Sequence, residues 1–339
     1  MSLLKEFYYN TCSLLPMQFL KAMAPATTLL PYHHIVSSEQ LPHIQHLYNY
    51  KSENQFIKDL DFLLKHYKPL SVSEIIQAII EDKKLPIQSF LLSFDDGFRE
   101  VHDIIAPILE KKGLPAIFFI NPAFIDNKEL FYRCKISLLI DKLQKNKTNN
   151  SILKIYCDAL HLEGKSIQNI VQALKKINQN NISILDNLAH QLNFSFDFFL
   201  QKEQPFLSSG QIQSLFKRGF SIGAHSMTHP YYHLLTLTDQ VNQTIYSCNY
   251  VNDLVGSKNC SFSFPHSDIK LNQELFNELK KTDIPLFFGI QNQKEELKNR
   301  MLHRFNAERP GIKINSQIKG LLLMMWLKNI FHNNNVIRK

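Results

Sequence analysis

Two polar clusters in the sequence have the residue types and the spacing that a hydrolytic metal site requires. Asp95 and Asp96 directly follow the apolar run 89–94, and His225 and His229 stand four residues apart just after another apolar run. One carboxylate and two imidazoles can hold a divalent cation and leave positions open for water, as catalytic sites do. The second carboxylate is then available as a general base. Each cluster alone also has a simpler explanation, because Asp-Asp-Gly can form a turn or cap a helix, and two histidines four residues apart can occur by chance.

The pattern around these clusters predicts an α/β fold in which both lie at the carboxyl ends of strands. Short apolar strands are predicted at 27–36, 89–94, 115–120, 219–224, 260–264, 286–290 and 301–306. Helical patterns separate most of them. Such alternation is typical of a parallel sheet or barrel, whose site lies at the carboxyl ends of the strands. Pro31 removes a backbone donor from the first strand, so we expect that strand near a sheet edge.

A block of helical patterns interrupts the alternation at residues 126–205. Apolar residues recur there at helical spacing, with joints rich in Lys, Asn and Gln between the stretches 130–143, 167–177 and 182–192. We therefore predict an all-helical insertion. The organisation predicted for the chain is a helical preface over 1–26, a barrel over 27–310 that contains the insertion, and an apolar and basic C-terminal helix over 311–339.

Composition excludes several classes of protein. The 339 residues are 44% hydrophobic and 20% charged, which is typical of a folded globular chain and not of a disordered one. Lys and Arg number 38 against 30 Asp and Glu, and the net charge of +8 suits an acidic polysaccharide, anionic lipid or nucleic acid without selecting among them. No glycine-rich phosphate loop is present. Neither nucleotide binding nor a nucleic-acid partner is therefore predicted.

The cysteines and the N-terminus bear on the compartment. The five cysteines are scattered without a C-x-x-C pair, so neither a disulfide framework nor a thiolate zinc site is predicted. Lys5 and Glu6 interrupt the apolar residues at the N-terminus, and no signal peptide is predicted. No apolar run reaches the roughly 18 residues of a membrane-spanning helix. We expect a cytoplasmic protein.

Taken together, the two clusters resemble motifs of the polysaccharide deacetylase family, the carbohydrate esterases that share the NodB-homology domain. Residues 93–97, Ser-Phe-Asp-Asp-Gly, resemble the first motif, and residues 225–229, His-Ser-Met-Thr-His, resemble the second. The resemblance extends over about residues 27–310. It implies a distorted (β/α) barrel, a bound divalent metal and the hydrolysis of acetyl groups on sugars.

The resemblance also implies a role for each motif residue. Asp95 corresponds to the general base and Asp96 to a metal ligand, with His225 and His229 as the other two ligands. Zn²⁺ is the expected ion, and Co²⁺ and Ni²⁺ are alternatives. The chemistry implied is that the ion lowers the pKa of water and polarises the acetyl carbonyl, while Asp95 removes the proton from the attacking water.

The third motif is recognisable at residues 262–267, Phe-Ser-Phe-Pro-His-Ser, but it is altered. Ser263 stands where many members have an arginine that orients the base, and His266 stands at a tyrosine whose backbone N–H donates to the oxyanion. A late segment resembles the closing leucine-x-arginine strand of one subgroup. From this we expect Arg304 to supply the base-orienting charge and His303 to protonate the leaving amine. Neighbours on a strand face opposite sides, so both point inward only across a bulge.

Several aromatic and histidine residues could line the substrate cleft or be structural. His33, near the end of the first predicted strand, is the histidine that we expect in the cleft, and a hydrogen-bonded structural histidine is the alternative. Tyr48 belongs to a loop rich in His and Tyr that could stack on sugar rings, although a surface loop is the favoured interpretation. Phe131 and Arg133 could border the groove, or the aromatic residues there could staple a helix.

The function expected from this reasoning is metal-dependent removal of acetyl groups, N-acetyl before O-acetyl, from a saccharide or glycan precursor. The expected partner is an N-acetylated saccharide or glycolipid. Two alternatives stay open. One is an amidase that acts on a small non-sugar C–N bond on the same fold, and the other is a sugar-binding or scaffold protein that lost turnover through its third-motif changes.

The C-terminal helix has apolar residues nearly all round. Residues 321–327 are all apolar, and Lys319 and Lys328 flank them. Such a helix must be buried in something, either the outer wall of the barrel or the boundary of a membrane. We therefore predict either docking on the barrel or peripheral contact with an anionic membrane through 318–331.

Overall fold

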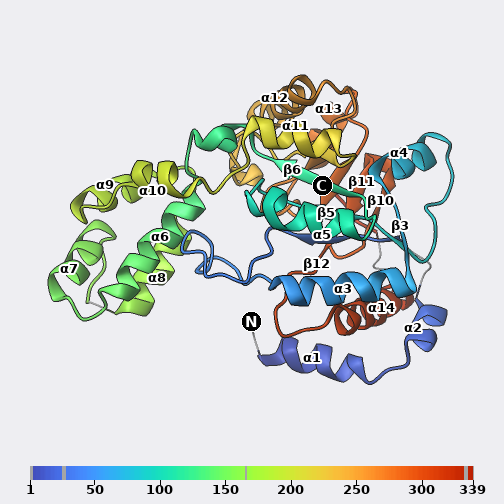
Figure 1. The fold of residues 1–339 in the computed structure, drawn as a ribbon, viewed down its shortest axis with the longest axis horizontal. Coiled ribbons are helices and arrows are strands. Elements are labelled where there is room, and N and C mark those ends of the chain that lie inside the picture. The colour runs from blue at the N-terminus through green and yellow to red at the C-terminus, as the bar shows by residue number, and fades with distance from the viewer. Residues whose placement is uncertain (1–2, 25–27, 165, 332–334, 339) are drawn as a thin grey trace.

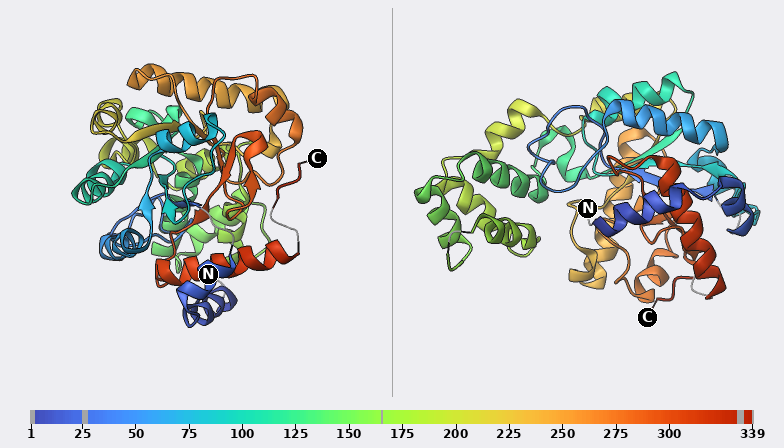
Figure 2. Two further views of the ribbon diagram at one scale, coloured as in Figure 1. Left: turned by 90° about the vertical axis from the view of Figure 1, so that its right-hand side faces the viewer. Right: turned by 90° about the horizontal axis from the view of Figure 1, so that it is seen from below.

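The computed structural model describes residues 3–24, 28–164, 166–331 and 335–338, and places helices around a curled sheet (Figure 1 and Figure 2). Its strands are β1 (Thr28–Leu29), β2 (Pro31–His33), β3 (Lys68–Pro69), β4 (Ser89–Phe90), β5 (Leu92–Phe94), β6 (Ala116–Ile120), β7 (Ser221–Ala224), β8 (Phe262–Ser263), β9 (Phe287–Gly289), β10 (Glu295–Glu296), β11 (Met301–His303) and β12 (Phe305–Asn306). The helices outside the insertion are α1 (Leu3–Ser13), α2 (Met17–Met23), α3 (Glu53–His66), α4 (Val72–Ile80), α5 (Ala106–Lys111), α11 (Ser209–Lys217), α12 (Leu237–Val255), α13 (Gln273–Leu279) and α14 (Ile314–Ile330).

One chain segment closes the sheet into a distorted barrel. The strand order is β10-β11-β9-β8-β7-β6-β5-β2-β12, and every neighbouring pair except β10 with β11 is parallel. β11 and β12 both lie within 301–306, yet β11 pairs with β9 and β12 pairs with β2 at the other end of the order. The predicted α/β barrel is therefore confirmed, and the strand predicted at 301–306 is divided at Arg304.

The strands of the barrel are apolar because both of their faces are covered. All five residues of β6 are buried, from Ala116 to Ile120. On one side they pack with residues of α3 and α5, such as Leu60 and Leu109, in one continuous core cluster. A continuous apolar run of this kind is the signature of a parallel strand with covered faces. The polar residues that the sequence analysis singled out follow directly where such strands end.

The first predicted strand is interrupted, and its predicted edge position is wrong. β1 joins β4 and β3 in a separate small sheet, whereas β2 lies inside the barrel between β5 and β12. On the β12 side, Phe305 N donates to Leu30 O and Ala307 N donates to Tyr32 O. Neither hydrogen bond needs the N–H that Pro31 lacks, which explains how a proline fits in an interior strand. Residue 27 of this prediction lies outside the described residues.

The region predicted as a helical insertion contains five helices in its described part. They are α6 (Tyr132–Lys145), α7 (Asn150–Ala159), α8 (Ile167–Lys176), α9 (Ser183–Gln191) and α10 (Phe196–Glu203). In Figure 1 they stand together beside the barrel. Their buried residues form a core of their own, which also takes in Ile35 and Ile44 from the loop after β2. This loop and the start of α6 connect the helical region to the barrel.

The C-terminal helix α14 docks on the molecule itself. It packs against α1, α2 and α3 (Figure 1), and the buried Leu321, Leu322 and Met325 belong to the main core. A Cβ on Gly320 would lie 2.9 Å from the rings of Tyr8 and Tyr9, so glycine permits the close approach of α1. No helix in the described part of the chain is long and apolar enough to cross a membrane. Contact with a membrane surface through 318–331 stays a prediction.

Candidate active site

The two adjacent aspartates reach one pocket because the chain turns sharply at the end of β5. Asp95 N still donates to His33 O of β2 at 2.9 Å, and the backbone then enters the left-handed region at Asp96, φ 73°, and Gly97, φ 66°. A Cβ on Gly97 would lie 3.1 Å from Ile120 Cγ2, so both its φ and its surroundings favour glycine. Both carboxylates consequently line the same cavity, which alternation along a regular strand would prevent.

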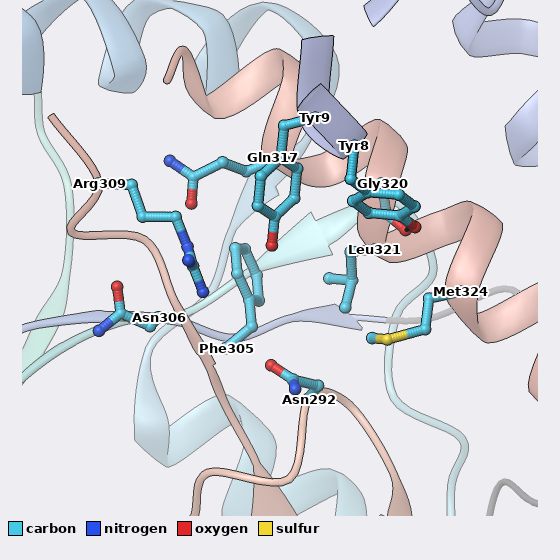
Figure 3. A pocket seen from close by; sticks show the side chains of 10 residues that line it. All are labelled: Tyr8, Tyr9, Asn292, Phe305, Asn306, Arg309, Gln317, Gly320, Leu321 and Met324. Atoms are coloured by element: carbon cyan, nitrogen blue, oxygen red, sulfur yellow. Dashed lines mark hydrogen bonds between the residues drawn. The ribbon is translucent and has the colours of Figure 1, made fainter. Parts of the chain in front are cut away.

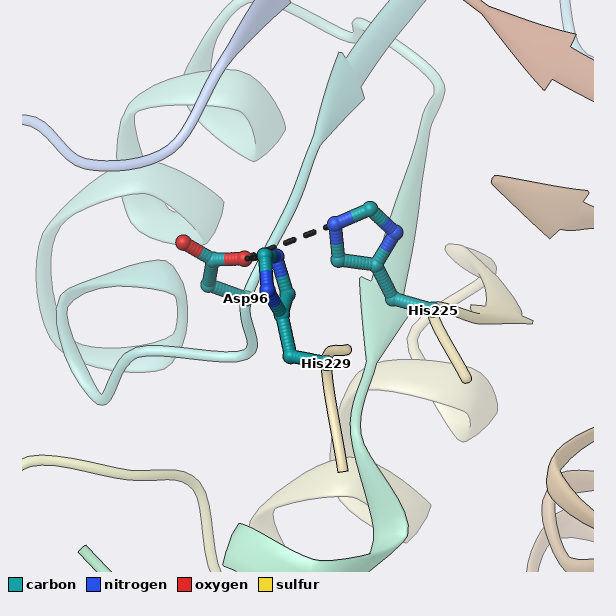
Figure 4. A group of neighbouring side chains, drawn as sticks. All are labelled: Asp96, His225 and His229. Atoms are coloured by element: carbon teal, nitrogen blue, oxygen red, sulfur yellow. Dashed lines mark ion pairs between the residues drawn. The ribbon is translucent and has the colours of Figure 1, made fainter. Parts of the chain in front are cut away.

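The structure brings Asp96, His225 and His229 together (Figure 4). Asp96 Oδ1 lies 3.1 Å from His229 Nε2 and 3.5 Å from His225 Nε2, and all three residues are buried. Asp96 Oδ1 accepts no hydrogen bond from any group in the described part of the chain. A buried carboxylate oxygen that faces two imidazole nitrogens without a hydrogen bond fits the donor set of a divalent cation. The three residues therefore suit such an ion.

His225 is held in the form that a metal ligand needs. It follows β7 directly, and its Nδ1 lies 2.8 Å from Ser263 O, so Nδ1 carries the proton and Nε2 keeps its lone pair toward Asp96. Burial lowers the pKa of His225 to about 4, which leaves the ring neutral near pH 7. The loop to His229 is tied down as well, because Asn121 Nδ2 donates to Ser226 O at 3.0 Å and His229 N donates to Ser226 Oγ at 3.0 Å.

Arg304 forms a buried bidentate ion pair with Asp95. Its two terminal nitrogens donate to the two carboxylate oxygens at 2.7 and 2.8 Å, and further to Ser93 Oγ at 3.1 Å and Ser263 Oγ at 2.6 Å. Burial alone would raise the pKa of Asp95, but the charge of Arg304 and its hydrogen bonds bring the pKa below its usual value. Arg304, between β11 and β12, thus contacts the Asp95 carboxylate at the end of β5, and the hydroxyl of Ser263 accepts a hydrogen bond from the same guanidinium.

We expect Arg304→Met to destabilise the protein at neutral pH by about 3–5 kcal/mol, because it leaves the buried Asp95 carboxylate without its partner. In the wild type the lowered pKa of Asp95 gives stability that is present above its unfolded value and lost as pH falls through the folded value. In the variant, burial dominates and raises the pKa of Asp95 above its unfolded value. The stability of the variant should therefore increase as pH falls from 7 to 5, because the buried carboxyl becomes neutral. Urea unfolding of metal-chelated protein at both pH values measures this.

Ser263→Ala is the matched control for this prediction. It removes one hydrogen bond to the guanidinium and keeps the ion pair, so it should cost about 1 kcal/mol at either pH. Equal stability of Arg304→Met and Ser263→Ala at pH 7 would contradict a stabilising role for the pair.

The prediction that His33 lines the cleft is wrong, because the next residue, His34, does so. The pocket is lined by Tyr32 and His34, whereas His33 faces the core, where its ring stacks on Phe94 and meets Phe56 edge-on. Side chains alternate along β2, so Tyr32 and His34 share one face and His33 takes the other. The sequence shows two adjacent histidines, and nothing local identifies the face that each takes.

His34 has an acidic partner that the sequence analysis did not identify. Its Nδ1 lies 2.7 Å from Glu308 Oε2, and Glu308 Oε1 also accepts from the His34 and Ile35 backbone N–H groups. Burial alone would lower the pKa of His34, but the ion pair with Glu308 raises it to about 9. The ring stacks on Tyr48 with centroids 4.5 Å apart. A protonated imidazole therefore lines the pocket at neutral pH, and the Tyr48 loop lies against the site rather than on the surface.

His303 does not reach this pocket, contrary to the expectation that it protonates the leaving amine. Its Nε2 lies 2.8 Å from Glu296 Oε2, and its Nδ1 lies 3.7 Å from Asp268 Oδ2. Arg338 donates to both of these carboxylates, which makes a separate buried ionic network. No bulge turns both neighbours inward, so Arg304 takes the inner face and His303 the outer one.

His266 of the altered third motif lines the pocket. Its ring stacks on Tyr231 with centroids 3.7 Å apart, and its Nε2 lies 3.2 Å from Tyr132 Oη. Burial lowers the pKa of His266 well below its usual value, so the ring is neutral. The backbone has φ 57° at this residue, and no hydrogen bond in the described part of the chain uses the His266 N–H. That N–H is thus available to a ligand.

The insertion contributes to the pocket wall. Phe131 and Arg133, at the start of α6, line a cavity of about 170 Å³ together with the two aspartates and the histidines. Arg133 donates to Tyr231 Oη at 3.2 Å, and no ion pair in the described residues neutralises it. Of the two interpretations of Phe131 and Arg133, the structure therefore supports the one in which they border the groove.

The chain is similar to one protein family and to several solved structures. The sequence profile described as "Polysaccharide deacetylase" matches residues 82–287, which is more than half of the chain. No curated protein matches the sequence significantly. Among solved structures, the chain resembles the deacetylase PplD of Streptococcus pyogenes (12% identity, 88% of this chain, 99% of that chain, TM-score 0.56) and IcaB from Ammonifex degensii (14%, 88%, 98%, 0.55). It also resembles a de-N-acetylase from Aggregatibacter actinomycetemcomitans (15%, 86%, 99%, 0.53).

Proposed function

Because this chain belongs to the polysaccharide deacetylase family, we propose that it removes N-acetyl groups from a saccharide or glycan precursor with the help of one divalent cation. Membership of the family makes the chain a hydrolase that deacetylates a polysaccharide by breaking amide C–N bonds. The observation that carries this proposal is one pocket in which three potential metal ligands lie beside a carboxylate held by Arg304. The further assignments below are made residue by residue.

Asp96, His225 and His229 would hold the cation. The neutral state of His225 and the unbonded Oδ1 of Asp96 support this assignment. Two imidazoles and one carboxylate suit Zn²⁺ first, and Co²⁺ or Ni²⁺ are alternatives. When bound, such an ion acts as a Lewis acid toward a carbonyl oxygen and lowers the pKa of water.

Asp95 is the proposed general base. The two hydrogen bonds from Arg304 fix the plane of its carboxylate and keep it ionised near pH 7. An ionised carboxylate can take the proton from the water that attacks the acetyl carbon. The free His266 N–H would then donate to the oxyanion that develops on the acetyl oxygen. Arg304 is a positioning residue here, since it acts through Asp95.

His34 is the proposed proton donor to the leaving group. Collapse of the tetrahedral species breaks the C–N bond, and the nitrogen must gain a proton because an amide anion is a very poor leaving group. A protonated imidazole with a pKa of about 9 in the same pocket can supply it. An alcohol leaves with less need of a strong proton donor, and so His34 favours an N-acetyl over an O-acetyl substrate.

The intact polar network argues against a scaffold that lost turnover. That alternative depends on the changes in the third motif, and Arg304, between β11 and β12, provides the charge that Ser263 does not. The direct experiment is acetate release from N-acetylglucosamine oligomers with added Zn²⁺ or Co²⁺, compared with chelated enzyme. Release that is equal with and without chelator would refute metal dependence, and no release from any N-acetylated saccharide would refute the function.

Glu308→Gln should shift the alkaline limit of activity to lower pH. The proposed acid works only while His34 is protonated, so activity falls as pH rises through its pKa. Without the Glu308 charge, burial dominates and lowers the pKa of His34 from its wild-type value of about 9. The kcat of the variant should therefore already fall between pH 7 and 9, where the wild type is still active. An unchanged alkaline limb would contradict His34 as the acid.

A further inference from the structure

A second cavity is lined by residues of α1, α14, β12 and the segment that follows β12 (Figure 3). It has a volume of about 320 Å³ between α1, α14 and the chain around residues 305–309. All of its lining residues lie outside the stretch 82–287 that the family profile matches. The cavity is therefore made by parts of this chain beyond the matched region, and the proposed reaction does not use it.

This cavity has one cation and no acid in its wall. Arg309 lines it, and none of the other lining residues is Asp or Glu. No ion pair involves Arg309 in the described part of the chain, and its Nε is buried without a hydrogen-bond partner. Its guanidinium lies 5.3 Å from the centre of the Tyr9 ring. A guanidinium that lines a cavity without an acidic partner is suited to bind an anion.

A buried acceptor in the same wall also lacks a partner. Gln317 is 2% exposed, and its Nε2 is held by Ala307 O at 3.3 Å and Ile312 O at 3.2 Å. Its Oε1 has no hydrogen bond in the described residues. Figure 3 shows this oxygen on the cavity side, between the side chains of Arg309 and Tyr9. A buried acceptor without a partner is destabilising, so a ligand that donates a hydrogen bond to Gln317 Oε1 would be stabilised there.

The rest of the wall combines aromatic rings with amides. Tyr8, Tyr9 and Phe305 present rings, and Asn292 presents an amide (Figure 3). Tyr8 Oη donates to Gly320 O at 2.7 Å, which fixes that ring. Flat apolar surfaces together with planar hydrogen-bonding groups match the ring face and the hydroxyls of a pyranose.

We propose that this cavity is a second saccharide site and that it takes a sugar carrying a carboxylate. The carboxylate would pair with Arg309, a hydroxyl would donate to Gln317 Oε1, and the ring would lie against the aromatic side chains. The choice of a saccharide over other carboxylates rests on the proposed function. The walls of the two cavities are in contact, because Asn306 Nδ2 of this wall donates to the hydroxyl of Tyr32, which lines the active-site pocket, at 3.5 Å.

Two further observations favour an acidic glycan. Arg133 in the active-site pocket is also a cation with no ion pair in the described chain, so both cavities present an unpaired guanidinium. The chain as a whole carries a net charge of +8, which favours encounter with polyanions.

The test is calorimetric titration of the full-length enzyme with β-1,4-linked tetraglucuronate and with cellotetraose. These probes differ only in the C6 carboxylates, and neither carries an acetyl group, so binding is measured without turnover. Wild type should bind tetraglucuronate, and Arg309→Gln should weaken this binding about tenfold, as expected for the loss of one charge-assisted contact. Arg218→Gln is the matched control, because it removes an arginine that pairs with Glu110 on the surface. It should leave the affinity unchanged.

Several results would overturn the proposal. One is equal affinity for the two tetrasaccharides, and another is unchanged binding in Arg309→Gln. If Arg133→Gln alone abolished binding, the acidic sugar would belong to the active-site pocket. Octanoate that binds in an Arg309-dependent manner and more tightly than tetraglucuronate would identify a lipid-type carboxylate as the ligand. None of these outcomes bears on acetate release, so failure of this proposal and failure of the deacetylase proposal are distinguishable.

Discussion

Asp95→Asn is expected to lower kcat for acetate release by about 10³-fold and to leave metal content unchanged. The substitution removes a base and keeps the ligand set of Asp96, His225 and His229 intact, and general-base catalysis accounts for about 10²–10⁴-fold in rate. Steady-state kinetics together with elemental analysis of the purified variant measure both quantities. The rate loss should appear in kcat more than in KM, because proton removal occurs only in the transition state.

Two comparisons make this result interpretable. Asp96→Asn should lose metal along with activity, and if Asp95→Asn lost metal instead, the roles of the two aspartates would be exchanged. Asp95→Asn also leaves the buried Arg304 without its ionised partner, so its unfolding temperature must be compared with that of Arg304→Met. A variant that is folded at the assay temperature and keeps full activity would exclude Asp95 as the base.

His225→Ala and His229→Ala should each weaken binding of Zn²⁺ by more than about 100-fold. Changing a partner of a metal ligand typically costs 10–100-fold in affinity, and loss of a ligand itself should exceed this. Acetate release at limiting metal should fall in parallel, and excess Co²⁺ or Zn²⁺ should restore part of it. Competition with a chromogenic chelator measures the affinity of the unloaded protein.

His233→Ala is the matched control for these variants. This histidine lies in the same loop region, but its side chain is exposed and outside the pocket. The affinity of the His233→Ala variant for metal should equal that of the wild type. Stoichiometric and equally tight metal binding by His225→Ala and His229→Ala would show that the three residues do not form the metal site.

The sequence by itself determined the elements of the barrel and the residues at the ends of its strands. Apolar runs form buried parallel strands wherever helices can cover both faces, so the runs before Asp95 and His225 predicted the strands correctly. A residue that directly follows such a strand must lie at the carboxyl edge of the sheet, and this local rule is enough to place Asp95, Asp96 and His225 at that edge. Their motifs also identified the family.

Tertiary structure alone decided which face each strand residue takes. His33 and His34 are equivalent in the sequence, and so are His303 and Arg304. With a side-chain period of two, one step in register exchanges pocket and core. The register of β2 is set by its pairing with β5 and β12, and the register of the closing segment is set by β9 and β2. Those strands lie far away in the sequence, so no local pattern could determine which face each residue takes.

Long-range partners were also decided only by the fold. Glu308 raises the pKa of His34 from 274 residues away in the chain, and the closing segment must first span from β9 to β2 before this pair can form. The second cavity likewise requires α1 to lie against α14, which depends on the space at Gly320. Local sequence determines which residues follow a buried strand, but contacts between distant segments exist only after the barrel closes, and these contacts set charge, orientation and access.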